Sequence, residues 1–157
     1  MKCANCGGTI NLNESCPECG IDYSEMLKKV KHPEMKRLFK KLKDLDRYHK
    51  RSDIDESLLA CELADSSLII PAAIDGDEFI PLFVVDAKKK SFIILCTDME
   101  EFSHFEQLGV TALTIPWKSV FKFIEKDDGI VINMFSERCQ LNRHFLKQYF
   151  EDNYARP

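Results

Sequence analysis

The sequence predicts an α+β protein in which a mixed, roughly five-stranded sheet carries packed helices, preceded by a small cysteine-rich head and an amphipathic helix. Three observations lead to this fold class. The head has little aliphatic content, the next segment places apolar residues at helical steps among basic ones, and the remainder passes from apolar strands to strand–helix alternation. A chain of 157 residues has room for one ordinary domain and a small appendage. We therefore divide it into residues 1–22, 23–52 and 53–157.

The head, residues 1–22, holds four cysteines in two close pairs with the spacing C-x2-C-x9-C-x2-C. They are Cys3, Cys6, Cys16 and Cys19. In each pair one tight turn directs both sulfurs toward a common point, so two facing pairs surround Zn²⁺ tetrahedrally. A segment this short cannot bury enough surface to fold alone. We expect a zinc ribbon, and because thiolates fill all four positions, the zinc is predicted to be structural rather than catalytic.

Other uses of the four cysteines stay open on sequence alone. Iron takes the same ligands in rubredoxin, whose knuckle the stretch CPECG resembles, although the nine-residue gap here is shorter. Two disulfides are disfavoured because no secretory signal or membrane span is evident, and the isolated Cys61, Cys96 and Cys139 suit a reducing cytoplasm. A redox dithiol of the thioredoxin type requires one cysteine pair in a strand–helix setting, which two pairs in a loop-rich head do not supply. We therefore expect a cytoplasmic protein with a zinc-bound head.

Residues 23–52 are predicted to form a basic amphipathic helical connector. Pro33 divides a short piece, Ser24 to Lys31 with Ser24 as its N-cap, from the main helix. Residues 28–51 hold 11 of the 22 Lys and Arg residues and three acids, a net charge of +8. The apolar stripe comprises Met35, Leu38, Phe39, Leu42, Leu45 and Tyr48, and a helix bundle or dimer is the simplest way to bury it. The candidate basic contact surface comprises Lys36, Arg37, Lys40, Lys41, Lys43 and Arg47.

Residues 53–157 open with a helix that Ser52 and Asp53 cap, that runs through Asp65 and that carries Leu58, Leu59 and Leu63 on one side. The apolar run after it is broken at Asp75-Gly76 and at residues 86–90, which predicts a three-strand meander. Pro71 and Pro81 cannot donate to a strand ladder, so we expect both at an edge or a bulge.

The second half of this region alternates helices and strands. Thr97 and Glu100 fit a capping box for a helix to Leu108. The chain then continues with a strand over residues 112–115 and a helix from Pro116 or Trp117. It ends with a strand over residues 130–135 and a helix over residues 143–154. Asn142 is expected to cap the last helix, with Leu141 and Leu146 as a hydrophobic staple.

Five stretches carry a family resemblance: LLACELADSSLIIPAAI, EFIPLFVVDAKKKSFIILCTDMEEF, LTIPWKSVFKFI, DGIVINMF and NRHFLKQYF. In their order they resemble the N-terminal domain of the SseB family, named for enhanced serine sensitivity. The matching motif positions are Pro71, Pro81, Asp86, Thr97, Asp98 and Asn133, whereas Ala87 and Met134 depart from the usual glycine and proline. The head similarly resembles zinc-ribbon stubs at the front of many bacterial proteins. The resemblance implies an α+β interaction or regulatory module without an established enzymatic role.

No catalytic residue is predicted. The sequence holds no phosphate-binding loop, nucleophile elbow or zinc-protease motif, and the acids Asp98, Glu100 and Glu101 are explained as first-turn complements of a helix dipole. We expect a non-enzymatic module that binds another protein or itself, with no membrane and no evident small-molecule substrate. The alternative is a nucleic-acid-associated accessory factor that uses the ribbon and the basic helix.

Overall fold

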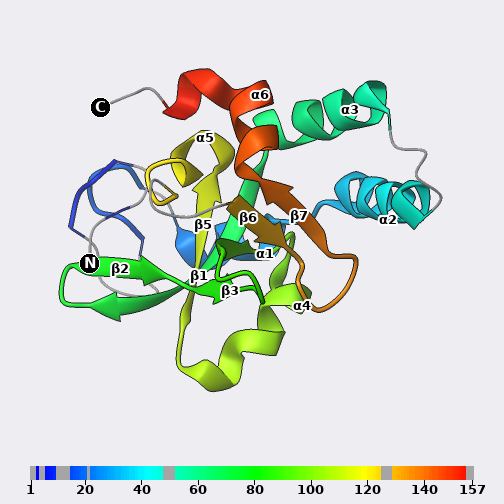
Figure 1. Ribbon diagram of the computed structural model, residues 1–157. Helices are drawn as coiled ribbons and strands as arrows, with labels where there is room; N and C mark the ends of the chain where they lie inside the picture. The colour runs from blue at the N-terminus through cyan, green and yellow to red at the C-terminus, as the bar shows by residue number, and fades with distance from the viewer. Residues whose placement is uncertain are drawn as a thin grey trace.

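The computed structural model describes residues 3, 6–9, 15–20, 22–47, 52–124 and 129–154, and it confirms the α+β class (Figure 1). The helices are α1 (Tyr23–Lys29), α2 (Pro33–Arg47), α3 (Asp53–Ala64), α4 (Met99–Phe102), the 3-10 helix η1 (Ser103–Leu108), α5 (Trp117–Val120) and α6 (Arg143–Tyr154). The strands are β1 (Ser67–Asp75), β2 (Glu78–Pro81), β3 (Phe83–Val85), β4 (Ser91–Leu95), β5 (Thr111–Pro116), β6 (Gly129–Ile132) and β7 (Cys139–Asn142).

The strands form two sheets rather than the single roughly five-stranded sheet that we expected. One has the order β2-β1-β5 and is antiparallel; the other has the order β3-β4-β6-β7 and is mixed, because β4 and β6 run parallel. The sheets meet at Ile69 and Cys96, whose backbones exchange two hydrogen bonds of 2.9 and 2.8 Å. The predicted hairpin turn at Asp75-Gly76 is confirmed between β1 and β2.

The middle strand of the expected meander is broken at Leu82. Leu82 donates its N–H to the Pro71 carbonyl at 2.9 Å and accepts from the Ile94 N–H at 3.1 Å, so the chain crosses there from one sheet to the other. Pro81 ends the edge strand β2, as predicted. Pro71 lies in the middle strand β1, so the edge expectation is wrong for this residue. It is tolerated because β1 changes neighbour there, from Cys96 to β2, and only the Pro71 carbonyl is bonded.

The main core lies where α2, α3, α5 and α6 pack on the sheets. Phe39 and Leu42 of α2 share one buried cluster with Leu59 and Leu63 of α3 and with Trp117. Packing on the domain of the same chain therefore buries the α2 stripe in the described residues, and a dimer is not needed to cover it. Leu38 and Leu45 are partly buried against the same cluster, and Tyr48 lies outside the described residues.

A smaller core fills the opposite side of β4 and β6. Phe92 and Ile94 of β4 and Val131 of β6 pack there with Phe102 and Phe105 from α4 and η1. Alternate residues of β4 thus contribute to the two cores, as expected for a strand covered on both faces.

Helix ends agree with the sequence where the signal is local. Ser52 and Asp55 form a capping box at α3, and Asn142 Oδ1 accepts from the Phe145 N–H at 2.9 Å. At α1 the Ser24 cap is wrong: the helix begins at Tyr23, and Asp22 accepts from the Glu25 N–H at 3.3 Å.

The segment after β4 differs most from the sequence prediction of a single helix to Leu108. Asp98 rather than Thr97 caps α4, which is only four residues long and continues as η1 to Leu108. The strand expected over residues 130–135 ends at Ile132, and β7 was not expected at all. Among the described residues, no helix has the length and apolar character needed to cross a membrane.

Candidate metal centre

The four head cysteines come together in space. Their Sγ atoms all lie within 4.8 Å of one another. The Cys3 and Cys19 sulfurs are 3.7 Å apart, and the Cys6 and Cys16 sulfurs 3.6 Å apart. Four thiolates arranged tetrahedrally at about 2.3 Å from a metal lie about 3.8 Å from one another, whereas a disulfide needs about 2.05 Å. The cluster therefore has the size of a four-thiolate metal centre.

Both cysteine pairs lie in turns that a glycine closes. The Gly7 N–H donates to the Cys3 carbonyl and the Gly20 N–H to the Cys16 carbonyl, both at 2.8 Å. The two glycines have φ values of 78° and 73°, in the left-handed region that glycine adopts without strain. The C-x-x-C-G pattern thus encodes the turn that directs two sulfurs to one point.

The ligand set is half buried. Cys3 and Cys16 are buried, whereas Cys6 and Cys19 are exposed. The Gly8 N–H donates to Cys6 Sγ at 3.4 Å and lowers the pKa of that thiol, but desolvation and the three neighbouring thiols raise it more, to about 12. A bound cation would reverse this balance because it coordinates the thiolate. Metal uptake by the head should therefore release protons.

The other three cysteines lie outside this cluster. Cys96 is buried at the end of β4, and burial, followed by the charges of Glu101 and Asp98, raises its pKa to about 12. It is a neutral, small apolar side chain in that environment. Cys139 is buried in β7, and Cys61 is exposed on α3.

The basic contact surface predicted on α2 is partly neutralised. Lys36 Nζ lies 2.6 Å from Asp98 Oδ2, Lys41 Nζ lies 3.7 Å from Asp55 Oδ1, and Arg37 pairs with Glu34. Lys40, Lys43 and Arg47 are exposed. Half of the predicted cations therefore already have an acidic partner in this chain.

Two motif residues that are distant in sequence meet at the carboxyl ends of the parallel strands β4 and β6. The Thr97 N–H donates to Asn133 Oδ1 at 3.0 Å, and Asn133 Nδ2 donates to Thr97 Oγ1 at 2.9 Å. Nearby, the Ser136 hydroxyl donates to the buried Glu101 carboxylate. Sequence reasoning named Thr97, Glu101 and Asn133 but not these pairings, which join residues 35 and 36 positions apart.

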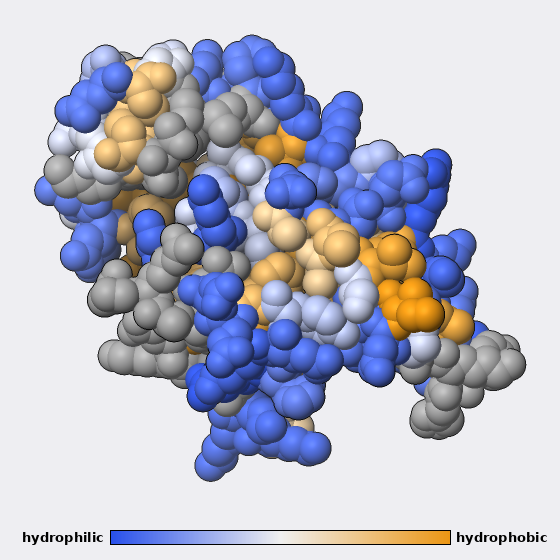
Figure 2. Space-filling model, turned by 90° about the horizontal axis from the view of Figure 1, so that it is seen from above, coloured by the Kyte–Doolittle hydropathy of each residue, from blue (hydrophilic) through white to orange (hydrophobic). Residues whose placement is uncertain are grey.

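The expectation that Leu58 shares one side of α3 with Leu59 and Leu63 is wrong, because Leu58 lies on an exposed apolar face of this helix. Ile54 and Leu58 are 73% and 49% exposed, and Cys61 is exposed one turn further on. Figure 2, which looks down on the side formed by α3 and α6, shows an apolar area toward the end of the molecule where α3 lies. The sequence signal was the spacing 54, 58, 61, which repeats a helical step opposite the buried Leu59 and Leu63.

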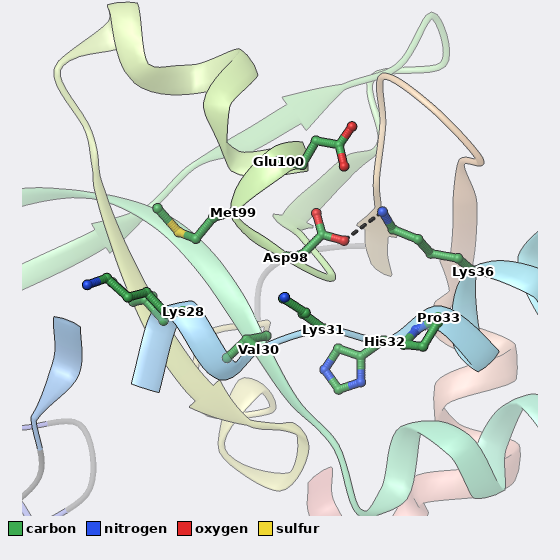
Figure 3. A pocket seen from close by; sticks show the side chains of 10 residues that line it. Lys28, Val30, Lys31, His32, Pro33, Lys36, Asp98, Met99 and Glu100 are labelled. Carbon is green, nitrogen blue, oxygen red and sulfur yellow. Dashed lines mark ion pairs between the residues drawn. The ribbon is translucent and has the colours of Figure 1, made fainter. Parts of the chain in front are cut away.

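A pocket of about 330 Å³ lies between the α1–α2 junction and the start of α4 (Figure 3). Val30 and Met99 form part of its apolar lining, and Lys31, Lys36 and Asp98 supply charged groups. No local sequence pattern indicates this pocket, because its two sides come from segments about 65 residues apart.

Comparison of the chain with protein-family models, with curated proteins and with solved structures finds no match.

Proposed function

We propose that this chain is a non-enzymatic, cytoplasmic protein-interaction or regulatory module with a structural zinc ribbon at its head and an SseB-like α+β domain. The Sγ–Sγ distances of 3.7 Å between Cys3 and Cys19 and 3.6 Å between Cys6 and Cys16 support the metal part of the proposal. Four thiolates complete a tetrahedral shell and leave no position for a substrate. The metal then braces the head, whose few apolar residues cannot fold it alone.

Zinc is proposed over iron because zinc ribbons commonly place C-x-x-C knuckles at this short spacing. The test is elemental analysis of protein purified under reducing conditions. We expect one zinc ion per chain and a colourless protein. A red protein with a thiolate-to-iron absorption band, or one without bound metal, contradicts the assignment.

The observation that carries the interaction part is the exposed face of α3. Ile54, Leu58 and Cys61 lie at helical steps on the side opposite the core, and Asp65 continues the same line. Isolated exposed apolar residues are common, but three in one stripe on a helix is the pattern of a docking face. All charged residues of α3 are acidic, so the partner segment should be apolar with basic flanks.

Substitution at the centre of this face tests the proposal. The chain and its Leu58→Glu variant are used to capture partners from the native cell, and each captured protein is then titrated as a purified component. Leu58→Glu should weaken binding by about 30-fold, as expected for a central apolar contact. Leu108→Glu is the matched control, because Leu108 is also exposed, 65%, but lies on η1. Equal binding by the two variants would show that α3 is not the contact face.

The nucleic-acid alternative rests on the exposed Lys40, Lys43 and Arg47 of α2. This alternative predicts that the chain binds RNA or DNA with an affinity that falls steeply as the salt concentration rises. It also predicts that a Lys40→Gln, Lys43→Gln double variant loses this binding. The ion pairs of Lys36, Arg37 and Lys41 with acids of this chain leave three of the six predicted cations for phosphates. For this reason we favour the protein-binding function.

A further inference from the structure

We propose that the pocket between the α1–α2 junction and α4 binds a small organic monocarboxylate with an apolar body, such as a medium-chain acyl or aryl carboxylate. This binding site is separate from the metal centre and from the α3 face. Its volume of about 330 Å³ falls within the range of small-molecule sites in proteins. Its two sides come from α1, the junction and the start of α2 on one hand, and from the start of α4 on the other.

The lining is apolar where a ligand body would lie. Leu27 and Val30 face Met99 across the pocket, and all three also pack against the smaller core. Pro33 adds a ring at the first residue of α2. Such a surface favours an aliphatic or aromatic body over a sugar or a nucleotide, because those ligands need more hydrogen-bonding groups than this lining offers.

The charges of the pocket select a single negative charge. Lys31 has no ion pair or hydrogen bond to any other described residue, and Figure 3 shows its ammonium between the Val30 side and the Asp98 side. Lys36 is already neutralised by Asp98 at 2.6 Å. Lys28 is loosely paired with Glu25 at 4.0 Å, and Glu100 lines the pocket as an acid. Lys31 is therefore the cation available to a ligand, and the acids nearby disfavour a phosphate dianion.

The walls are held in place without a ligand. The Lys36–Asp98 pair joins α2 to the N-cap of α4, and its two side chains are only 30% and 15% exposed. His32 Nε2 lies 2.6 Å from the Ser67 carbonyl, which can only accept, so this nitrogen carries a proton and ties the junction to β1. A pocket with fixed walls loses little entropy on binding, so one charge and a short apolar body suffice for measurable affinity.

The test uses octanoate as the probe and the full, metal-loaded chain. Isothermal titration measures its affinity, and ¹³C-methyl spectra locate the binding through the methyl groups of Val30 and Met99. Lys31→Gln should weaken octanoate binding about 10-fold, because it removes the charge-assisted hydrogen bond. Lys29→Gln is the matched control: Lys29 is exposed on α1 next to Lys28 but does not line the pocket, so its loss should change affinity less than two-fold.

Two further probes separate the contribution of the ligand's charge from that of its apolar body. Octanamide, which keeps the chain but lacks the charge, should bind at least 10-fold more weakly than octanoate and be insensitive to Lys31→Gln. Inorganic phosphate should not compete with octanoate. The proposal is overturned if octanoate does not bind, if Lys29→Gln and Lys31→Gln weaken it equally, or if the Val30 and Met99 methyl signals do not shift.

Discussion

Removal of the Phe39 ring is the sharpest test of whether α2 belongs to the main domain or only connects to it. Phe39 is 1% exposed, and it lies in the same buried cluster as Leu59, Leu63 and Trp117. Transfer of a buried phenylalanine side chain to water costs about 1.5–3 kcal/mol, and the cavity that Phe39→Ala leaves raises the total to about 3–5 kcal/mol. For a chain of this length that loss lowers the melting temperature by about 6–20 °C.

Trp117 provides the assay, because it is the one tryptophan of the chain and is 1% exposed beside Phe121 and Phe150. Its fluorescence during urea unfolding reports on the main core. Phe39→Ala should lower the midpoint of that transition, whereas Lys40→Ala, at an exposed position on the same helix, should change stability by less than about 0.5 kcal/mol. An unchanged Trp117 midpoint in Phe39→Ala, with helical signal lost in a separate step, would refute the reasoning and restore an independent connector.

Chelation should remove one metal ion and abolish the dispersed amide signals of Gly7, Gly8 and Gly20, yet leave the Trp117 midpoint unchanged, because neither buried core includes a head cysteine. Lys36 and the Glu101 N–H outweigh desolvation and hold the pKa of Asp98 below its ordinary 3.8, so its ionised form stabilises the fold. Asp98→Asn keeps the N-cap oxygen but loses the charge, so it should cost up to about 1 kcal/mol above pH 3.8. Its difference from the natural chain should shrink as the pH falls below that value, measured by urea unfolding across pH. Gly129→Ala should destabilise by about 1–3 kcal/mol in the same assay, because the added Cβ would meet the Leu141 carbonyl and the Phe92 ring between β6 and β7.

The features that could be predicted from the sequence depend on neighbours within a few residues. The Ser52–Asp55 capping box, the Asp75-Gly76 turn and the Asn142 cap each need only their own turn of chain. The cluster of four cysteines belongs to the same class, because each C-x-x-C-G unit sets its own turn and the two units lie ten residues apart. For these features the local physical chemistry is sufficient.

The features that could not be predicted are set by distant partners. Thr97 looks like a helix cap from its neighbours, but its hydroxyl meets Asn133, so Asp98 takes the cap. The break at Leu82 depends on the Pro71 carbonyl and on β4, neither of which the local pattern reveals. The apolar stripe of α2 indicates that this face of the helix is buried. The stripe alone does not indicate whether residues of the same chain, as in this structure, or of another chain cover it.

The turn after β4 links the buried strand ends to the proposed ligand pocket. Ligand sites in parallel sheets commonly lie at the carboxyl ends of the strands. At these ends of β4 and β6, however, the polar atoms of Thr97 and Asn133 hydrogen-bond to each other, and the two residues are only 0% and 1% exposed. Asn133 holds this position at φ 54°, which asparagine tolerates better than most residues. Asp98, the residue after Thr97, caps α4 and pairs with Lys36. Because one short turn both seals the strand ends and builds a wall of the pocket, the accessible polar chemistry of this region lies beside the sheet rather than at its strand ends.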